Sequence, residues 1–131
     1  MIGSLAPHAQ TFLLALGALT LVLFSIPIAL APLFWARLVG WTIPLERDLA
    51  VYFGRCLGAF ALILNFFMLR AALTGEALTP TFQFMAMVWG TMIVVHIVGA
   101  IQRVQPIIET LEIGFWIALA LLTGAFWPVS S

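Results

Sequence analysis

The sequence predicts an all-α fold: an integral membrane four-helix bundle with short loops, forming a single transmembrane domain over residues 1–131. Two observations predict it. Of the 131 residues, 64% are apolar and 8% are charged, whereas a soluble domain carries charge on about a quarter of its residues. The apolar residues are also grouped in four long segments. A run of about 20 such residues is long enough to cross a bilayer as a helix.

The first apolar segment runs over about residues 11–35, and no charge lies between Ala9 and Ala36. Pro27 and Pro32 lie in its last third. Because proline lacks the backbone N–H that a helix uses and its ring clashes with the preceding turn, we expect the first helix to kink or end there.

The second segment spans about residues 45–73 and begins with Glu46 and Asp48, which suits the positive end of a helix dipole. Its longest uncharged run is residues 56–69, which is shorter than the about 20 residues that a crossing needs. The segment therefore crosses only if Arg55 is accommodated inside the membrane.

The third segment covers about residues 82–105 and follows a turn that we expect at residues 74–76 and 79–81, where Pro80 lies between two threonines. The fourth covers about residues 107–127. Pro106 separates these two segments, since the residue before a proline rarely stays helical.

The arginines predict an orientation. With four crossings, the first and third loops share a side and carry Arg37, Arg47 and Arg103, whereas the opposite side carries Arg70 and the N-terminal amine. Short loops with more arginine stay in the cytoplasm. We therefore predict an integral protein of a bacterial inner membrane with both termini on the non-cytoplasmic side.

Charge and cysteine content exclude several partners and reactions. The five arginines are balanced by five acids, so the sequence predicts no nucleic-acid partner. One cysteine, Cys56, allows neither an internal disulfide nor a paired-thiol redox site. The short loops leave little surface outside the bilayer, so we expect the partners to be membrane lipids and either a membrane protein or a second copy of the chain.

Most ionisable residues, together with the polar Gln102, are predicted to lie near one membrane surface. They are Glu46, Arg47, Asp48 and Arg55 in the second segment, His96, Gln102 and Arg103 in the third, and Glu109 and Glu112 in the fourth. At about 1.5 Å rise per residue, Arg55 lies about 12 Å and His96 about 10 Å below that surface. An arginine facing lipid at this depth costs several kcal/mol. We therefore predict that Arg55 and Arg103 turn inward and pair with Glu112 and Glu109.

The predicted polar cluster or ligand-binding set also includes residues of other types. Its members are Arg55, His96, Arg103, Glu109, Glu112, Asn65 and Trp116. The set fits two interpretations. It is either a structural ion-pair network that fixes the bundle, or a polar pocket that binds a headgroup or a substrate.

His96 is the one histidine near this set. It fits a neutral, hydrogen-bonded member of the cluster, and ligation of a tetrapyrrole by His96 alone is the other option. A haem held by two histidines is not expected, because His8 lies at the opposite interface. No His, Cys and Asp set has the spacing of a zinc site, so the sequence predicts no metal site and no resident cofactor.

Three short motifs carry a resemblance to known proteins. They are residues 52–59 (YFGRCLGA), residues 96–100 (HIVGA) before Arg103, and Pro106 followed by Glu109 and Glu112. Together with the four spans, they resemble the small DoxX-like membrane proteins and, more distantly, the ergosterol-biosynthesis scaffold-like family. The resemblance implies a compact four-helix bundle, sometimes an accessory subunit or scaffold, with Arg55, His96, Arg103 and Glu112 as the shared polar set.

A second resemblance, in residue types alone, is to the emopamil-binding class of four-helix sterol-site proteins. In that class, buried acids, a histidine and tryptophans line a lipophilic cavity. The residues of matching type are His96, Glu109, Glu112, Asn65 and Trp116.

The sequence leaves two functions. The first is a non-enzymatic small membrane subunit or scaffold that associates with a larger membrane complex or with lipid through its apolar faces. The alternative is a lipophilic-ligand protein or isomerase-type enzyme in which Glu112 and His96 carry protons. An elongated apolar cavity ending at His96 and Glu112 favours the alternative, and a filled interior favours the subunit.

Overall fold

The computed structural model describes residues 2–128, and all of the regular structure in that range is helical. The elements are η1 (Ala6–His8), α1 (Ala9–Thr20), the π-helical turn η2 (Leu21–Ser25), α2 (Ile26–Leu30), α3 (Pro32–Leu38), α4 (Asp48–Thr74), α5 (Leu78–Gln102) and α6 (Ile107–Ala125). The predicted all-α fold class is confirmed. The predicted domain also includes residues 1 and 129–131, which lie outside the described residues.

Four helical stretches are long and apolar enough to cross a membrane, which makes this a small integral membrane protein. They are Ala6–Leu30, Asp48–Thr74, Leu78–Gln102 and Ile107–Ala125. Their number and order agree with the four segments that the sequence predicts.

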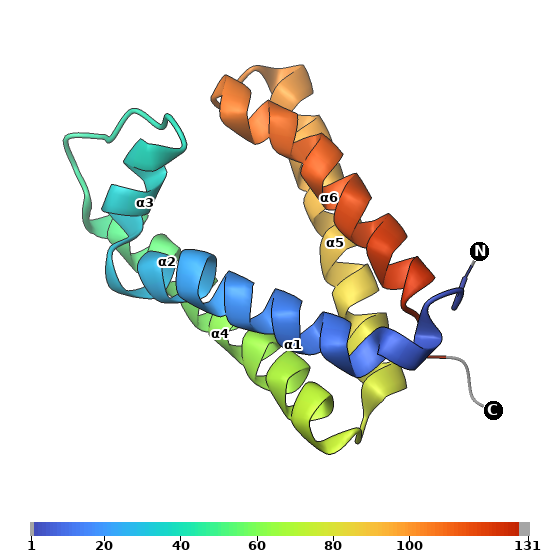
Figure 1. Ribbon diagram of the computed structural model, residues 1–131. Helices are drawn as coiled ribbons and strands as arrows, with labels where there is room; N and C mark the ends of the chain where they lie inside the picture. The colour runs from blue at the N-terminus through green and yellow to red at the C-terminus, as the bar shows by residue number, and fades with distance from the viewer. Residues whose placement is uncertain (1, 129–131) are drawn as a thin grey trace.

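The first span is interrupted where its prolines predict. Ala31, with φ of −136° and ψ of 59°, separates α2 from α3, because the residue before Pro32 is disfavoured in the helical region. Pro32 then begins α3, which turns away from the axis of α1 and α2 (Figure 1). Pro27 stays within α2, directly after the π-helical turn.

The other helix boundaries shift by a few residues from those predicted. The expected turn at residues 79–81 is wrong: these residues form the first turn of α5, where a proline is tolerated because its missing N–H has no helical partner. The same helix ends at Gln102, since Arg103 adopts a left-handed conformation with φ of 55°. At the second span, α4 begins at Asp48, so that Glu46 lies in the preceding loop.

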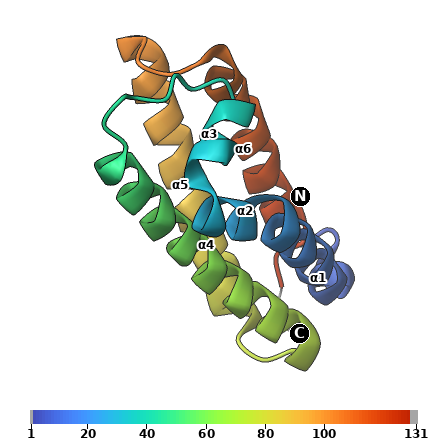
Figure 2. The same ribbon diagram turned by 90° about the vertical axis from the view of Figure 1, so that its left-hand side faces the viewer.

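The spans pack as two pairs, with α1 and α2 against α4, and α5 against α6 (Figure 1, Figure 2). The pairs meet where α1 begins, α4 turns into α5 and α6 ends, and we call this the closed end. They diverge toward α3 and the α5–α6 turn, which we call the open end. The bundle is therefore closed at one end rather than compact along its whole length.

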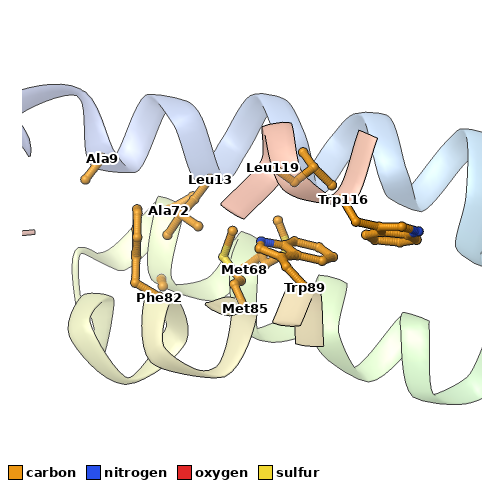
Figure 3. Packing of buried hydrophobic residues seen from close by; sticks show 10 residues of the cluster. Ala9, Leu13, Met68, Ala72, Phe82, Met85, Trp89, Trp116 and Leu119 are labelled. Atoms are coloured by element: carbon orange, nitrogen blue, oxygen red, sulfur yellow. The ribbon is translucent and has the colours of Figure 1, made fainter. Parts of the chain in front are cut away.

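The hydrophobic core lies at the closed end and receives side chains from every span (Figure 3). Its members are Ala9, Leu13, Met68, Ala71, Ala72, Phe82, Met85, Trp89, Trp116 and Leu119. Inside a bilayer, lipid is as apolar as these side chains, so the core stabilises the fold through close van der Waals packing rather than through removal from water.

Two glycines of α4 bring the first span close. A Cβ at Gly58 would overlap the backbone of Ala29, and a Cβ at Gly54 would overlap the Pro32 ring. The four-residue spacing of these glycines is the pattern that allows helices to approach in membranes. The approach occurs within the chain, between α4 and the α2–α3 region.

Candidate functional site

Three of the predicted polar residues meet at the open end. His96 comes from the last turns of α5, and Glu109 and Glu112 come from the first turns of α6. The two glutamates are three residues apart and so share one face of α6. The Nε2 atom of His96 lies 3.1 Å from Oε2 of Glu109 and 3.6 Å from Oε2 of Glu112.

The tight α5–α6 turn places these residues together. The side-chain amide of Gln105 donates to the backbone carbonyl of His96 at 3.0 Å and to the hydroxyl of Thr110 at 3.1 Å. Gly99 leaves room for the Gln105 side chain, which a Cβ would overlap. The turn thus ties the start of α6 to the helical turn that carries the imidazole.

The hydrogen bonds of His96 place a hydrogen on one of its ring nitrogens. Its side chain is 4% exposed, and Nδ1 lies 2.7 Å from the carbonyl oxygen of Met92. A carbonyl only accepts, so Nδ1 carries a hydrogen. In the neutral ring, Nε2 then offers a lone pair, which also accepts a long hydrogen bond from Nε1 of Trp116 at 3.4 Å. This lone pair faces carboxylate oxygens, so the cluster has a place for a proton or a cation between them.

Trp41 reaches the cluster from the loop after α3. Its indole N–H donates to Oε1 of Glu109 at 2.9 Å, which leaves Oε2 turned toward the histidine. Sequence reasoning missed this residue, because its position depends on the fold of the loop between α3 and α4. The one signal in the sequence is the indole N–H of a tryptophan, which can donate a hydrogen bond to a polar site.

An open cavity of about 370 Å³ lies between the two helix pairs, and the cluster forms part of its wall. The first span and its following loop supply most of its wall, including Phe24, Ile28 and Leu33. One face of α4 supplies Ala50, Gly54 and Leu57, and the far side presents Met92, His96, Glu109 and Glu112. The lining is apolar except for Thr42 and these last three polar side chains.

The predicted arginine pairs are wrong. Arg55 and Arg103 are exposed, and among residues 2–128 the one arginine–carboxylate pair is Arg70 with Glu76 at 3.1 Å. The reason is the direction of α4: the face that carries Gly54 and Gly58 packs against the first span, and Arg55 lies beside that face, away from the cavity-lining side. Arg103 lies beyond the end of α5.

Asn65 is buried, but it belongs to the first helix pair and not to the cluster. Its Nδ2 donates to the Gly17 carbonyl at 3.0 Å and to the Thr20 hydroxyl at 2.7 Å, and its Oδ1 accepts from the Ser25 hydroxyl. These bonds all go from α4 to the first span, as a buried amide in a membrane requires. The role of Asn65 is therefore to hold this pair together.

Trp116 joins the core to the cluster. It is 5% exposed, stacks on Trp89 with ring centroids 5.5 Å apart, and touches His96. The surroundings of His96 do not suit a tetrapyrrole. Such a ligand needs an open slot in front of Nε2, and Glu109, Glu112 and Trp116 occupy that position.

No family model, curated protein or solved structure matches this chain. The resemblances to the DoxX-like, scaffold-like and emopamil-binding proteins therefore rest on the motifs and residue types alone. Structure and sequence together describe a small all-α integral membrane protein with four candidate membrane spans and a cavity whose lining includes His96, Glu109 and Glu112.

Proposed function

We propose that this protein binds a lipophilic molecule within the membrane. The apolar part of the molecule lies between the two helix pairs, and its polar end lies against His96, Glu109 and Glu112. The observation that supports this proposal is the cavity, which these three side chains help to line. It is the feature that distinguishes a ligand-binding protein from a subunit whose interior is filled.

Size and lining both suit a small lipophile. Cavities that bind small molecules are commonly about 300–1,000 Å³, with apolar walls and a few convergent polar groups that orient the ligand. The cavity here is about 370 Å³. Trp35 and Trp41 add flat aromatic surface beside the aliphatic wall, and such rings contribute large contact areas.

Access from the bilayer is consistent with this proposal. The cavity lies at the open end, where the helix pairs diverge, and the four spans are surrounded by lipid. A lipophilic molecule dissolved in the membrane reaches such a cavity without crossing water. The polar cluster then selects among lipophiles by requiring a polar group at one end.

The test is to fill the cavity from one wall. Ala50→Phe adds a ring where Ala50 lines the cavity, and Ala59→Phe adds the same ring to the same helix at an exposed position. The purified proteins are exposed to a brominated fatty acid, and quenching of tryptophan fluorescence reports its approach to Trp35 and Trp41. We expect saturable quenching in the wild type and in Ala59→Phe, and its loss in Ala50→Phe.

Two results would contradict the proposal. One is quenching of the folded wild-type protein that rises linearly and never saturates. The other is equal saturable quenching in Ala50→Phe and Ala59→Phe, which would place the lipophile on the outer surface.

The subunit function remains a second candidate, because Arg55 is exposed within a membrane span. It lies seven residues after the start of α4, which is about 10 Å along the helix. A guanidinium at such depth is stabilised by a carboxylate, and no described residue of this chain provides one. The partner this favours is another membrane protein with an acidic side chain at that depth.

Native mass measurement after mild detergent extraction tests this candidate. We expect a complex that dissociates in Arg55→Leu and stays intact in Arg37→Leu, a control at an exposed position in the last turn of α3. A monomeric wild-type protein, or a complex that survives Arg55→Leu, counts against a partner at this position.

A further inference from the structure

We infer that His96, Glu109 and Glu112 form a binding site for one divalent first-row transition-metal ion. The spacing of these residues did not predict a metal site, because twelve residues and a turn lie between the histidine and the first glutamate. The inference goes beyond the proposed lipophile binding and does not depend on it.

The ligand atoms already converge. One imidazole nitrogen and one oxygen from each carboxylate all lie within 4.8 Å of one another. Metal bonds of about 2.0–2.2 Å in a tetrahedral site place neighbouring ligand atoms about 3.3–3.6 Å apart. The two distances from Nε2 of His96, 3.1 and 3.6 Å, are close to that spacing. Small rotations of the two carboxylates complete the geometry.

The groups behind the ligands are those of a metal site. Histidines that bind metals usually donate their other ring N–H to a backbone carbonyl or a carboxylate, which fixes the ring and raises its basicity. His96 does this through Nδ1 and the Met92 carbonyl at 2.7 Å. One oxygen of Glu109 is likewise held by the Trp41 indole, so that the other oxygen is directed at the cluster.

The charge of the cluster also favours a cation. Two carboxylates lie at the start of a membrane span, and neither forms an ion pair with an arginine of the described chain. A protonated His96 would balance only one of the two negative charges, and uncompensated charge is costly in a water-poor environment. A divalent ion with two carboxylates and a neutral imidazole forms a neutral unit, and metal binding replaces the long hydrogen bond from Trp116.

The ligand set selects the class of metal. Imidazole and carboxylate together suit Zn²⁺, Fe²⁺ and Mn²⁺, whereas Mg²⁺ and Ca²⁺ prefer oxygen ligands alone. Three protein ligands leave at least one coordination position free. Because the three side chains line the cavity, we expect that free position to face it, where water or the oxygen atom of a bound lipophile can occupy it.

The experiment uses the full chain, purified in detergent with an affinity tag that lacks histidine and stripped with a chelator. Zn²⁺, Mn²⁺ or Fe²⁺ is then added separately, and bound metal is measured by elemental mass spectrometry. We expect one ion per chain, and a loss of affinity of at least about tenfold in His96→Gln and in Glu112→Gln. Co²⁺ in place of Zn²⁺ gives a visible spectrum that reports nitrogen and oxygen ligation.

His8→Gln and Glu76→Gln are matched controls, since both residues are exposed and lie outside the cluster. They should bind metal as the wild type does. The inference is overturned if the folded wild type takes up no ion, or if His96→Gln binds as tightly as the wild type. Circular dichroism verifies that each variant is folded.

The lipophile assay, repeated in chelator, separates the two proposals. Saturable quenching without metal uptake overturns the metal site and leaves the proposed function standing. Metal uptake without saturable quenching overturns the proposed lipophile binding and leaves the metal site standing.

Discussion

The closed and open ends of this molecule are built from similar apolar spans but packed in different ways. At the closed end, all four spans contribute to one core, and Phe82, Leu13 and Met85 are fully buried. At the open end, the two helix pairs border a cavity instead, and its polar side chains face a shared centre. The boundary between the two regions is the stacked pair Trp89 and Trp116.

The comparison separates polar groups that hold the structure together from polar groups that are arranged to bind a ligand. Buried polar groups of the first helix pair satisfy one another, as Asn65 does with the first span, and they hold structure. At the open end, three groups present electron pairs to the same point. Packing alone does not require that arrangement, because two ionised carboxylates so close to each other repel.

The largest effect is expected from a single methyl group at the contact that holds the first pair together. Gly58→Ala places a Cβ against the Ala29 backbone and should destabilise the fold by about 1–3 kcal/mol. Gly90→Ala is the control, since a Cβ there meets no atom within 4 Å. It should stabilise α5 by about 0.5–1 kcal/mol, because alanine favours helix over glycine.

Unfolding in a graded mixture of mild detergent and sodium dodecyl sulfate measures both variants. Opposite signs at the two positions support the close approach of α4 to the first span. Stabilisation by Gly58→Ala would show that α4 and α2 lie too far apart for a Cβ at Gly58 to meet the Ala29 backbone.

The sequence predicted well how deep each polar residue lies in the membrane, but it predicted poorly which side of its helix the residue occupies. Hydropathy and proline positions gave the four spans, and residue rise correctly placed His96 near the level of the glutamates. The same reasoning put Arg55 at that level, but depth does not say which side of a helix a residue occupies. The rotation of α4 is set by the packing of its Gly54 and Gly58 face against the first span, and this packing leaves Arg55 on another side of the helix.

The boundary of α5 shows a similar limit of local reasoning. Pro80 beside two threonines is typical of a turn, and it is equally compatible with the first turn of a helix. The cavity was beyond prediction for another reason. It arises from the divergence of two helix pairs, which depends on contacts between distant segments rather than on any one of them.

An intermediate effect is expected at Trp41, which tests whether its hydrogen bond to Glu109 orients this side chain for metal binding. Trp41→Phe keeps the ring and removes the N–H that holds Glu109, so metal affinity should fall about tenfold. Trp35→Phe is the control, because Trp35 lines the same cavity but has no hydrogen bond to the cluster. The stability of both variants should stay within about 0.5 kcal/mol of the wild type.

Metal titration of the two purified variants compares them directly. Equal affinities in Trp41→Phe and Trp35→Phe would mean that the loop after α3 does not contribute to the cluster. An equal fall in both would assign the effect to the shape of the cavity.

The smallest effect is expected at Arg103, and it separates the structure from the sequence-based prediction. If Arg103 paired with Glu109, Arg103→Gln would leave a partly buried carboxylate without its partner and destabilise the fold by about 3–5 kcal/mol. In the structure Arg103 is exposed and forms no ion pair with a described residue, so the change should be within about 0.5 kcal/mol. Unfolding measurements resolve a difference of that size. A near-zero value leaves His96 as the one basic side chain within 4 Å of the two carboxylates among the described residues. One imidazolium balances at most one carboxylate, and a divalent metal ion balances both.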